Sequence, residues 1–146
     1  MKLVIDANIL VSAYTADGKI RACWRRTSRE HDPIISPEIF AEVERTIRKR
    51  EFLLSDFAAR SALLDILKTC KVIRTRGQYL GSVPDEGDRH IVCLASQTGA
   101  DAIITGDHAL QKAKQFAGTV ILSFADFVGE YCTSGRTVLN GAAVSR

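Results

Sequence analysis

The chain has 146 residues, of which 46% are hydrophobic and 25% charged, and its formal net charge is +3. These proportions are typical of a globular protein and exclude a disordered or low-complexity chain, and the length suits one domain. No apolar stretch approaches the roughly 20 residues that a membrane-spanning helix needs. Met1 leads directly into a predicted strand without an apolar leader, so we expect a cytoplasmic protein that does not bind membranes.

Cysteine spacing and charge limit the chemistry further. The four cysteines are scattered and form no C-x-x-C pair, so a zinc site is not expected and the thiols are predicted to be reduced. An isoelectric point of about 8.8 is compatible with an acidic partner such as nucleic acid, but does not require one.

Short apolar runs alternate with helical patterns along the whole chain. Strands are predicted at 2–5, 33–35, 71–74, 102–105 and 119–122. Helices are predicted at 8–14, 18–30, 37–50, 55–70, 85–98, 107–116 and 124–131. This alternation predicts an α/β fold with three layers, in which helices cover both faces of a central, mostly parallel five-stranded sheet.

Local signals add detail to three of these segments. Ser36 followed by Pro37 is typical of a helix start, with serine as the N-cap. The helix at 55–70 is predicted to bury four apolar side chains, which are Phe57, Leu63, Leu64 and Leu67. After a single domain at 1–132, residues 133–146 are small and polar and are predicted to form a flexible C-terminal tail.

Two of the predicted strands end at an aspartate. Asp6 directly follows the first strand, and Asp107 follows the strand at 102–105. The carboxyl ends of parallel strands are where α/β sheets bind their ligands, so both aspartates are candidate site residues. Each has an alternative interpretation as the cap of the helix that begins beside it.

Two further acids lie near the inward edges of predicted helices. Glu42 lies one turn from Ile39 at the border of a buried face, and its alternative is an exposed ion pair with Arg45. Asp88 lies one turn before the next buried stripe, and its alternative is a capping box with Asp85. Four carboxylates from separated segments can converge on one pocket, and their oxygen atoms suit Mg²⁺ or Mn²⁺. Such a site favours phosphodiester hydrolysis by an activated water molecule.

Four segments resemble the PIN domain family, small Mg²⁺-dependent ribonucleases that include the VapC-type toxins of bacterial toxin–antitoxin pairs. The segments are L-V-I-D-A-N at 3–8, S-P-E-I-F-A-E at 36–42, D-E-G-D-R-H-I-V-C-L-A at 85–95 and A-I-I-T-G-D at 102–107. The resemblance extends over about the first 130 residues. It implies that the first and fourth strands are neighbours at the centre of the sheet, which would bring the two strand-end aspartates together.

The resemblance also implies a role for each matching residue. The catalytic and metal-binding quartet would be Asp6, Glu42, Asp88 and Asp107. Asn8 and Thr105 would support these carboxylates, and Asp85 matches an additional acid of one bacterial branch. Candidate RNA contacts are Arg45, Arg48, Lys49 and Arg89, for which an ordinary exposed side chain is the alternative. Trp24 and Tyr79 are either base-stacking side chains or packing residues.

The function that follows from the resemblance is that of an Mg²⁺-dependent endoribonuclease, with Mn²⁺ as a substitute cofactor. Its expected partners are an RNA substrate, an antitoxin protein and a second copy of the chain in a homodimer. Two alternatives remain open: a catalytically inactive PIN scaffold that binds RNA or protein, and a housekeeping RNA-processing nuclease without an antitoxin. The presence of all four acids favours an active enzyme.

Overall fold

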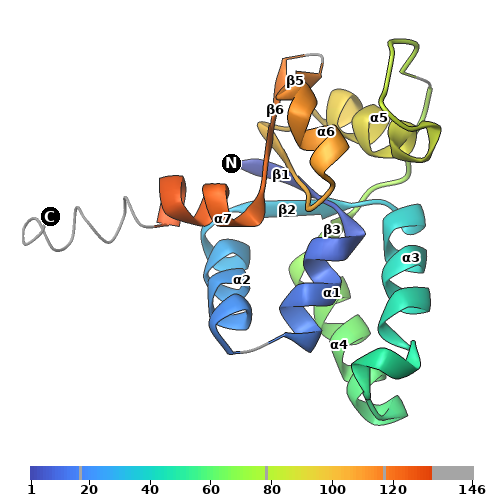
Figure 1. Ribbon diagram of the computed structural model, residues 1–146, viewed down its shortest axis with the longest axis vertical. Helices are drawn as coiled ribbons and strands as arrows, with labels where there is room; N and C mark the ends of the chain where they lie inside the picture. The colour runs from blue at the N-terminus through green and yellow to red at the C-terminus, as the bar shows by residue number, and fades with distance from the viewer. Residues whose placement is uncertain (17, 78, 117, 133–146) are drawn as a thin grey trace, which may run out of the picture.

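A six-stranded sheet forms the centre of the fold, in the order β3-β2-β1-β4-β6-β5 (Figure 1). The computed structural model describes residues 1–16, 18–77, 79–116 and 118–132. The strands are β1 (Lys2–Ile5), β2 (Asp32–Ile35), β3 (Lys71–Val72), β4 (Ala102–Ile104), β5 (Gln115–Phe116) and β6 (Thr119–Leu122). Five strands pair in parallel, and β5 pairs antiparallel with β6 at one edge.

Helices cover both faces of this sheet. They are α1 (Ala7–Thr15), α2 (Gly18–Glu30), α3 (Pro37–Ile47), α4 (Asp56–Thr69), α5 (Arg89–Thr98), α6 (His108–Ala113) and α7 (Phe124–Phe127). Shorter helical turns are η1 (Arg50–Phe52), η2 (Glu86–Asp88) and η3 (Val128–Cys132). In Figure 1, α1 to α4 lie on one side of β1 and β2, and α5 and α6 lie on the other. The predicted three-layer α/β class is confirmed, with six strands rather than five.

The pairing of β1 with β4 places the two predicted strand-end acids beside each other. Val4 pairs with Ile103 and Ile5 with Ile104, so both strands end at the same edge of the sheet. These side chains are at most 1% exposed, because α5 covers β1 and β4. The expected adjacency of the first and fourth strands is therefore confirmed.

Helix α3 begins as its sequence predicts. The Ser36 side chain accepts a hydrogen bond from the Ile39 amide, and Pro37 occupies the first helical position, where a missing N–H costs nothing. Ile39, Val43 and Ile47 form its buried stripe. The helix ends at Ile47 rather than at residue 50, and its N-terminal half carries Glu42.

The prediction of a helix over 107–116 is wrong at its end. Helix α6 stops at Ala113, because Lys114 adopts a left-handed backbone with φ of 64°. Gln115 and Phe116 then form β5. The Phe116 and Tyr79 rings pack edge to face, with their centroids 6.0 Å apart. Residues 115–116 continue the helical spacing of apolar residues, so this break depends on tertiary pairing rather than on local pattern.

The buried face of α4 is also different from the prediction. Leu63 is buried, but Phe57, Leu64 and Leu67 are 80%, 59% and 46% exposed. The inward stripe consists instead of Ala59, Ala62, Leu63 and Ile66. Alanines allow a helix to approach its neighbours closely, and this rotates the three larger side chains outward.

Two smaller differences, in β3 and α7, complete the comparison with the predicted elements. Strand β3 is confined to Lys71–Val72, and α7 ends at Phe127 before the π-helical turn η3. No helix among the described residues is long and apolar enough to cross a membrane. The tail predicted at 133–146 lies outside the described residues.

Helix α5 ends at a glycine in the left-handed region, which most residues with a side chain adopt only with strain. Gly99 has φ of 63°, and a Cβ built there meets nothing within 4 Å, so the penalty of a side chain is purely conformational. We expect Gly99→Ala to lower the free energy of unfolding by about 1 kcal/mol, measured by urea denaturation. Gly18→Ala is the matched control, because Gly18 begins α2 in equally open space without a positive φ and should be neutral or stabilising. Equal denaturation midpoints for the two variants would contradict this explanation.

Candidate active site

A threonine joins the two acids that follow β1 and β4. The Thr105 hydroxyl donates a hydrogen bond to Asp6 Oδ2 at 2.7 Å and accepts one from the Asp107 amide at 3.0 Å. The Asp6 amide donates to the Ile104 carbonyl at 2.9 Å, which continues the strand pairing by one residue. This edge of the sheet therefore fixes both acidic residues relative to each other.

Both strand-end acids also cap helices, as their alternative interpretation predicts. Asp6 Oδ1 accepts a hydrogen bond from the Ala7 amide at 2.7 Å, at the start of α1. Asp107 Oδ1 accepts from the Ala109 and Leu110 amides at 2.8 and 3.2 Å, at the start of α6. Capping uses one oxygen of Asp107, and no hydrogen bond from the described residues reaches its Oδ2. The capping and site interpretations are thus compatible.

Burial sets the acidity of Asp6. The residue is 6% exposed, and this burial raises the pKa of its carboxyl group. The hydrogen bonds from Thr105 and Ala7 lower that pKa, while the nearby charge of Asp107 raises it. A buried carboxylate held in this way keeps unused lone pairs on both oxygens, since each accepts one hydrogen bond.

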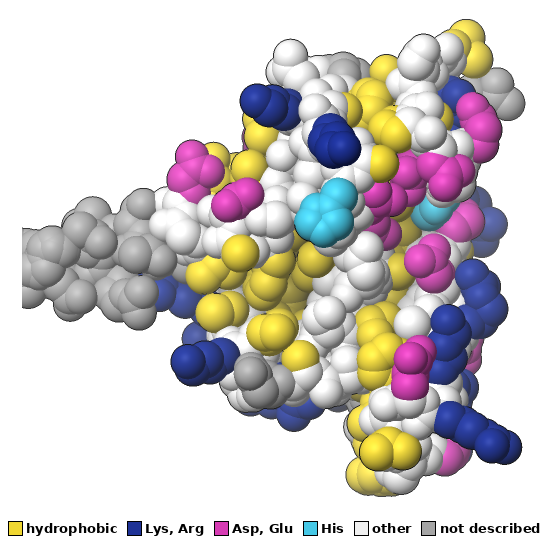
Figure 2. All heavy atoms as spheres, viewed as in Figure 1, with side chains coloured by type: hydrophobic (Ala, Val, Ile, Leu, Met, Phe, Trp, Pro, Cys, Tyr) yellow, Lys and Arg dark blue, Asp and Glu magenta, His cyan; other side chains and the backbone are white. Residues whose placement is uncertain are grey.

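Asp88 completes a three-acid cluster. It is the last residue of η2 and directly precedes α5, and its side chain makes no capping bond. Its Oδ2 is buried without a hydrogen-bond partner among the described residues. Burial first, and then the charges of Asp107, Asp6 and Asp85, raise the pKa of Asp88 to about 6. The capping interpretation applies to Asp85 instead, whose Oδ1 accepts from the Gly87 amide at 3.0 Å. Figure 2 shows acidic side chains gathered on this face of the molecule.

Asn8 holds the loop that follows β4. Its Oδ1 accepts a hydrogen bond from the Gly106 amide at 3.1 Å, and a Cβ at Gly106 would lie only 3.3 Å from the same oxygen. The absence of a side chain at Gly106 therefore allows this close approach. Asn8 contacts the backbone between Thr105 and Asp107 and orients the loop that carries them.

Glu42 is the predicted acid that lies in the middle of a helix. It is half-buried on α3, which packs against α1. The charges that shift the pKa of Asp6 or Asp88 are those of Asp107, Asp85, His90 and, for Asp88, Asp6. No ion pair between Glu42 and Arg45 is present among the described residues. The structure thus brings together Asp6, Asp88 and Asp107, with Asp85 near them.

His90 lies near the acidic cluster. Its spacing in the sequence does not predict this proximity. The imidazole is half-buried, interacts electrostatically with both Asp6 and Asp88, and has a buried Nδ1 without a partner in the described part of the chain. It lies two positions after Asp88, a spacing that on a regular helix places two side chains on different faces. Because Asp88 precedes the first residue of α5, this helical rule does not apply to the pair.

The donor atoms of the cluster fit a hard divalent cation. Asp88 Oδ2 is buried and unpaired, Asp107 Oδ2 accepts no hydrogen bond from the described residues, and neighbouring carboxylates repel one another. Within those residues, no three His, Cys, Asp or Glu side chains lie close enough to hold a metal ion by themselves. A cation bound here would therefore keep water ligands, as hard cations with oxygen ligands often do.

The basic residues proposed as RNA contacts fall into two groups. Arg48 forms an ion pair with Asp56 at 2.8 Å, and the Arg89 guanidinium is bound to Glu86 and to backbone carbonyls. Arg45 and Lys49 are exposed on the outer side of the α3 end.

The two aromatic candidates are packing residues. Trp24 is 1% exposed, and its indole N–H donates to the Tyr14 hydroxyl at 3.2 Å. Tyr79 contacts Phe116, as described above. Cys23, Cys70 and Cys93 are free thiols.

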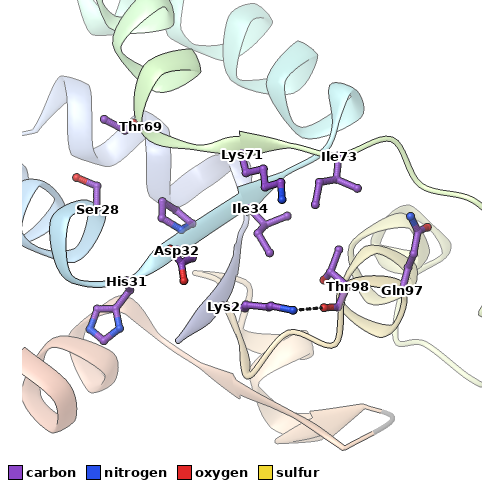
Figure 3. Close-up of a pocket in the computed structure, with 11 residues that line it drawn as sticks. Lys2, Ser28, His31, Asp32, Ile34, Thr69, Lys71, Ile73, Gln97 and Thr98 are labelled. Atoms are coloured by element: carbon purple, nitrogen blue, oxygen red, sulfur yellow. Dashed lines mark hydrogen bonds between the residues drawn. The ribbon is translucent and has the colours of Figure 1, made fainter.

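A surface hollow lies away from the acidic cluster. It has a volume of about 650 Å³ and lies where β1, β2 and β3 begin, at the opposite end of the sheet (Figure 3). Lys2 Nζ donates to the Thr98 carbonyl at 3.3 Å, at the C-terminal end of α5. The Lys2 ammonium group therefore opposes the negative end of the α5 dipole, and Lys71 also lines the hollow. The acidic cluster is the better candidate site, because it contains a buried unpaired oxygen and a carboxyl group with a strongly raised pKa.

Comparisons with known proteins assign the chain to a family. The PIN domain model matches residues 2–109, a segment that contains all four predicted acids. The fold is similar to VapBC2 from Rickettsia felis bound to a promoter DNA fragment, with TM-score 0.61, 16% identity and coverage of 84% of this chain and 98% of that chain.

Two further solved structures are similar. PAE2754 from Pyrobaculum aerophilum has TM-score 0.62 and 16% identity, covering 91% of this chain and 96% of that one. A PilT N-terminus domain protein from Sulfolobus solfataricus has TM-score 0.51 and 14% identity, and the alignment covers 88% of this chain and 92% of that chain. No curated protein matches the sequence. The structural similarities support the fold, and the family match covers more than half of the sequence. The chain therefore belongs to the PIN domain family, whose members are generally nucleases.

Proposed function

We propose that this protein is an Mg²⁺-dependent endoribonuclease that hydrolyses RNA phosphodiester bonds in the cytoplasm. The observation that carries the proposal is the convergence of Asp6, Asp88 and Asp107, which includes a buried carboxylate oxygen without a partner. Such an arrangement is unfavourable without a cation, because three carboxylates repel one another and burial disfavours their charge. Membership of the PIN family supports nuclease chemistry at these residues.

In this proposal Asp6, Asp88 and Asp107 hold Mg²⁺, or Mn²⁺ as a substitute, and Glu42 is the fourth acid. The bound ion supplies a Lewis acid that activates water and offsets the charge of the phosphodiester. Thr105 keeps Asp6 oriented through its hydroxyl, and the α6 cap keeps Asp107 oriented through Oδ1. Asp88 must lose its proton to serve as a ligand. Hydrolysis adds water to phosphorus and breaks the bond to O3′, which leaves a 5′-phosphate and a 3′-hydroxyl.

Substrate contacts are proposed for the basic side chains near the end of α3. Arg45 and Lys49 are exposed there and available to RNA phosphates. Arg48 and Arg89 remain part of the proposal, although an RNA phosphate would have to compete with their present partners. Asn8 and Asp85 are assigned supporting roles, since each binds backbone next to an acid of the cluster.

We also propose that the protein is the toxin of a toxin–antitoxin pair and acts as a homodimer. The fold similarity to VapBC2 of Rickettsia felis supports this biological context. A PIN scaffold without activity and an RNA-processing nuclease without an antitoxin are the alternatives. Expression of the protein alone distinguishes them: a toxin arrests growth, whereas the alternatives do not.

Cleavage of a total RNA pool tests the proposed activity. The wild type should generate new 5′-phosphate ends with Mg²⁺ and none with excess chelator, and mapping those ends gives the cleavage sequence. Asp6→Asn should abolish the new ends, whereas Asp32→Asn, on the exposed start of β2, should not. RNA binding without Mg²⁺-dependent cleavage by the wild type would favour the inactive scaffold.

A further inference from the structure

Three side chains on one face of α5 bind the backbone of the segment that leads to the acids. Arg89, Cys93 and Gln97 are spaced by four residues, and this spacing places them in one row along the helix. Gln97 contacts the backbone of Arg74 and Arg76, and Cys93 contacts the Gly77 carbonyl. Arg89 is the member of this row closest to Asp88. The row therefore attaches residues 74–77 and 79–81 to α5.

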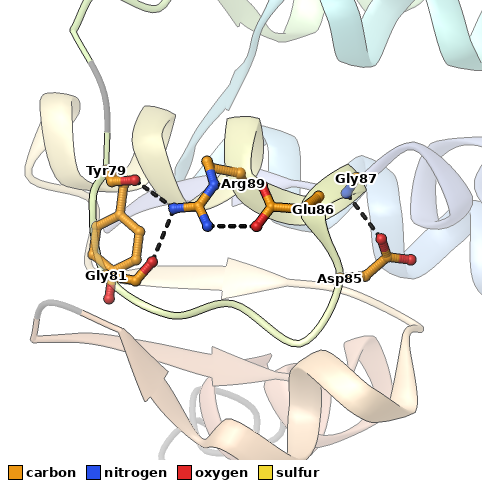
Figure 4. Close-up of polar contacts among 6 residues, drawn as sticks. All are labelled: Tyr79, Gly81, Asp85, Glu86, Gly87 and Arg89. Atoms are coloured by element: carbon orange, nitrogen blue, oxygen red, sulfur yellow. Dashed lines mark hydrogen bonds and ion pairs between the residues drawn. The ribbon is translucent and has the colours of Figure 1, made fainter.

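Arg89 makes the strongest of these attachments (Figure 4). Its Nη1 donates to the Tyr79 carbonyl at 2.6 Å and to the Gly81 carbonyl at 2.8 Å. Its Nε and Nη2 donate to the two carboxylate oxygens of Glu86 at 2.8 and 2.6 Å. Four of the five guanidinium N–H groups are thus used, and bidentate geometry of this kind is stronger and more directional than a single ion pair.

The partners of Arg89 lie on both sides of Asp85 in the sequence. Tyr79 and Gly81 precede Asp85, while Glu86 lies in η2, between Asp85 and Asp88. The Asp88 amide donates to the Asp85 carbonyl at 2.9 Å, so η2 forms one short turn that Arg89 clamps from outside. A change in this clamp moves the turn that carries both acids.

We infer that Arg89, together with Glu86, is a positioning residue that holds Asp85 and Asp88 in the geometry required for cation binding. This inference rests on the proposed function, because it assigns Arg89 to the same site. It differs from direct RNA contact by Arg89, since the guanidinium is directed toward the protein's own carboxylate and carbonyls. Residues that orient metal-binding carboxylates commonly change metal affinity tenfold or more when they are replaced.

Calorimetric titration of the protein with MnCl₂, without RNA, measures this role. Arg89→Lys keeps the positive charge but lacks the planar fork, and should raise the dissociation constant for Mn²⁺ about tenfold. Glu86→Gln should have an effect in the same direction, because it removes the anionic partner of the fork. The double variant Glu86→Gln/Arg89→Lys should be no weaker than Arg89→Lys alone, since both changes break one interaction.

Hydrogen exchange gives a second readout that does not depend on catalysis. The amides of Gly87 and Asp88 should exchange faster in Arg89→Lys than in wild type, since their acceptors lie in the clamped turn. Arg26→Lys is the matched control, because Arg26 forms an ion pair with Glu30 at 3.0 Å and its side chain is 29% exposed, against 31% for Arg89. Its Mn²⁺ affinity and exchange rates should equal those of the wild type.

Each outcome separates the inference from its alternatives. Unchanged Mn²⁺ affinity in both Arg89→Lys and Glu86→Gln overturns the positioning role. Direct RNA contact is indicated instead if Arg89→Lys has a raised KM for RNA but normal Mn²⁺ affinity. In that case Glu86→Gln should have a normal KM. If the wild type binds Mn²⁺ but cleaves no RNA, the proposed function fails while the positioning role is still measured by the titration.

Discussion

Asp88→Asn should reduce Mg²⁺-dependent RNA cleavage by roughly a hundredfold to a thousandfold, measured as initial rate at saturating RNA. Asparagine has nearly the same shape as aspartate, but it cannot supply the negative charge that a divalent cation requires. The same variant should stabilise the protein without metal at pH 7.5. The ionised Asp88 carboxylate is partly buried among Asp107, Asp6 and Asp85, and the substitution removes this repulsion.

The pH dependence of this stabilisation follows from the raised pKa. In the folded protein the pKa of Asp88 is about 6, whereas its ordinary value is 3.8. The folded state therefore binds the proton more tightly than the unfolded state, and the wild type loses stability as the pH rises from about 4 to above 6. The loss is on the order of 1 kcal/mol, because partial exposure screens the charge.

Thermal melting in chelator checks this result. Asp88→Asn should melt about 3 °C above the wild type at pH 7.5 and at the same temperature as the wild type at pH 4. Mg²⁺ should raise the melting temperature of the wild type but not that of the variant. Asp126→Asn, an exposed position on α7, serves as the control and should follow the wild type throughout. If Asp88→Asn and the wild type differ in melting temperature by the same amount at both pH values, ionisation of Asp88 does not destabilise the fold.

Thr105→Val should cost stability and activity together. Thr105 is fully buried, and valine preserves its shape while removing the donor to Asp6 and the acceptor for the Asp107 amide. The loss of a hydrogen bond to a buried charged group should lower the free energy of unfolding by about 2 kcal/mol. Cleavage should fall at least about tenfold, because Asp6 loses the contact that fixes its orientation.

Thr105→Ser distinguishes the hydroxyl from the packing. Serine keeps the O–H and removes one methyl group, which should cost about 1 kcal/mol of stability and leave cleavage close to the wild-type rate. Chemical denaturation gives the stability of each variant, and the RNA assay gives its rate. If serine and valine reduce cleavage equally, the hydroxyl has no role in orienting Asp6.

Local chemistry made much of the fold predictable. The N-cap at Ser36 and the glycine at the end of α5 lie within a few residues of the boundaries that they determine. Strand β4 is apolar throughout and β1 is apolar after Lys2, so their positions also follow from the sequence. That these two strands are neighbours does not follow from the residues alone, since strand order depends on packing between distant segments. The resemblance to a known family supplied it.

The features that local pattern did not predict depend on tertiary contacts. The apolar spacing of α4 fits two faces of the helix, and the small alanines determine which face is buried. The role of Arg89 was also hidden, because two of its acceptors are backbone carbonyls, which every sequence contains. For the site, the sequence identified Asp6, Asp88 and Asp107, which the structure places together, and the position of Glu42 relative to them remains a prediction.

The two edge strands of the sheet influence how other protein chains can bind. Strands β3 and β5 are the edge strands, and each has only two residues. Short edges expose few unpaired backbone groups, and Lys71 adds a charge at one of them. The sheet is therefore a poor template for an added strand, which protects concentrated solutions from aggregation through edge-to-edge pairing. Partners that bind this protein tightly will do so through helix faces and loops, and not by extending its sheet.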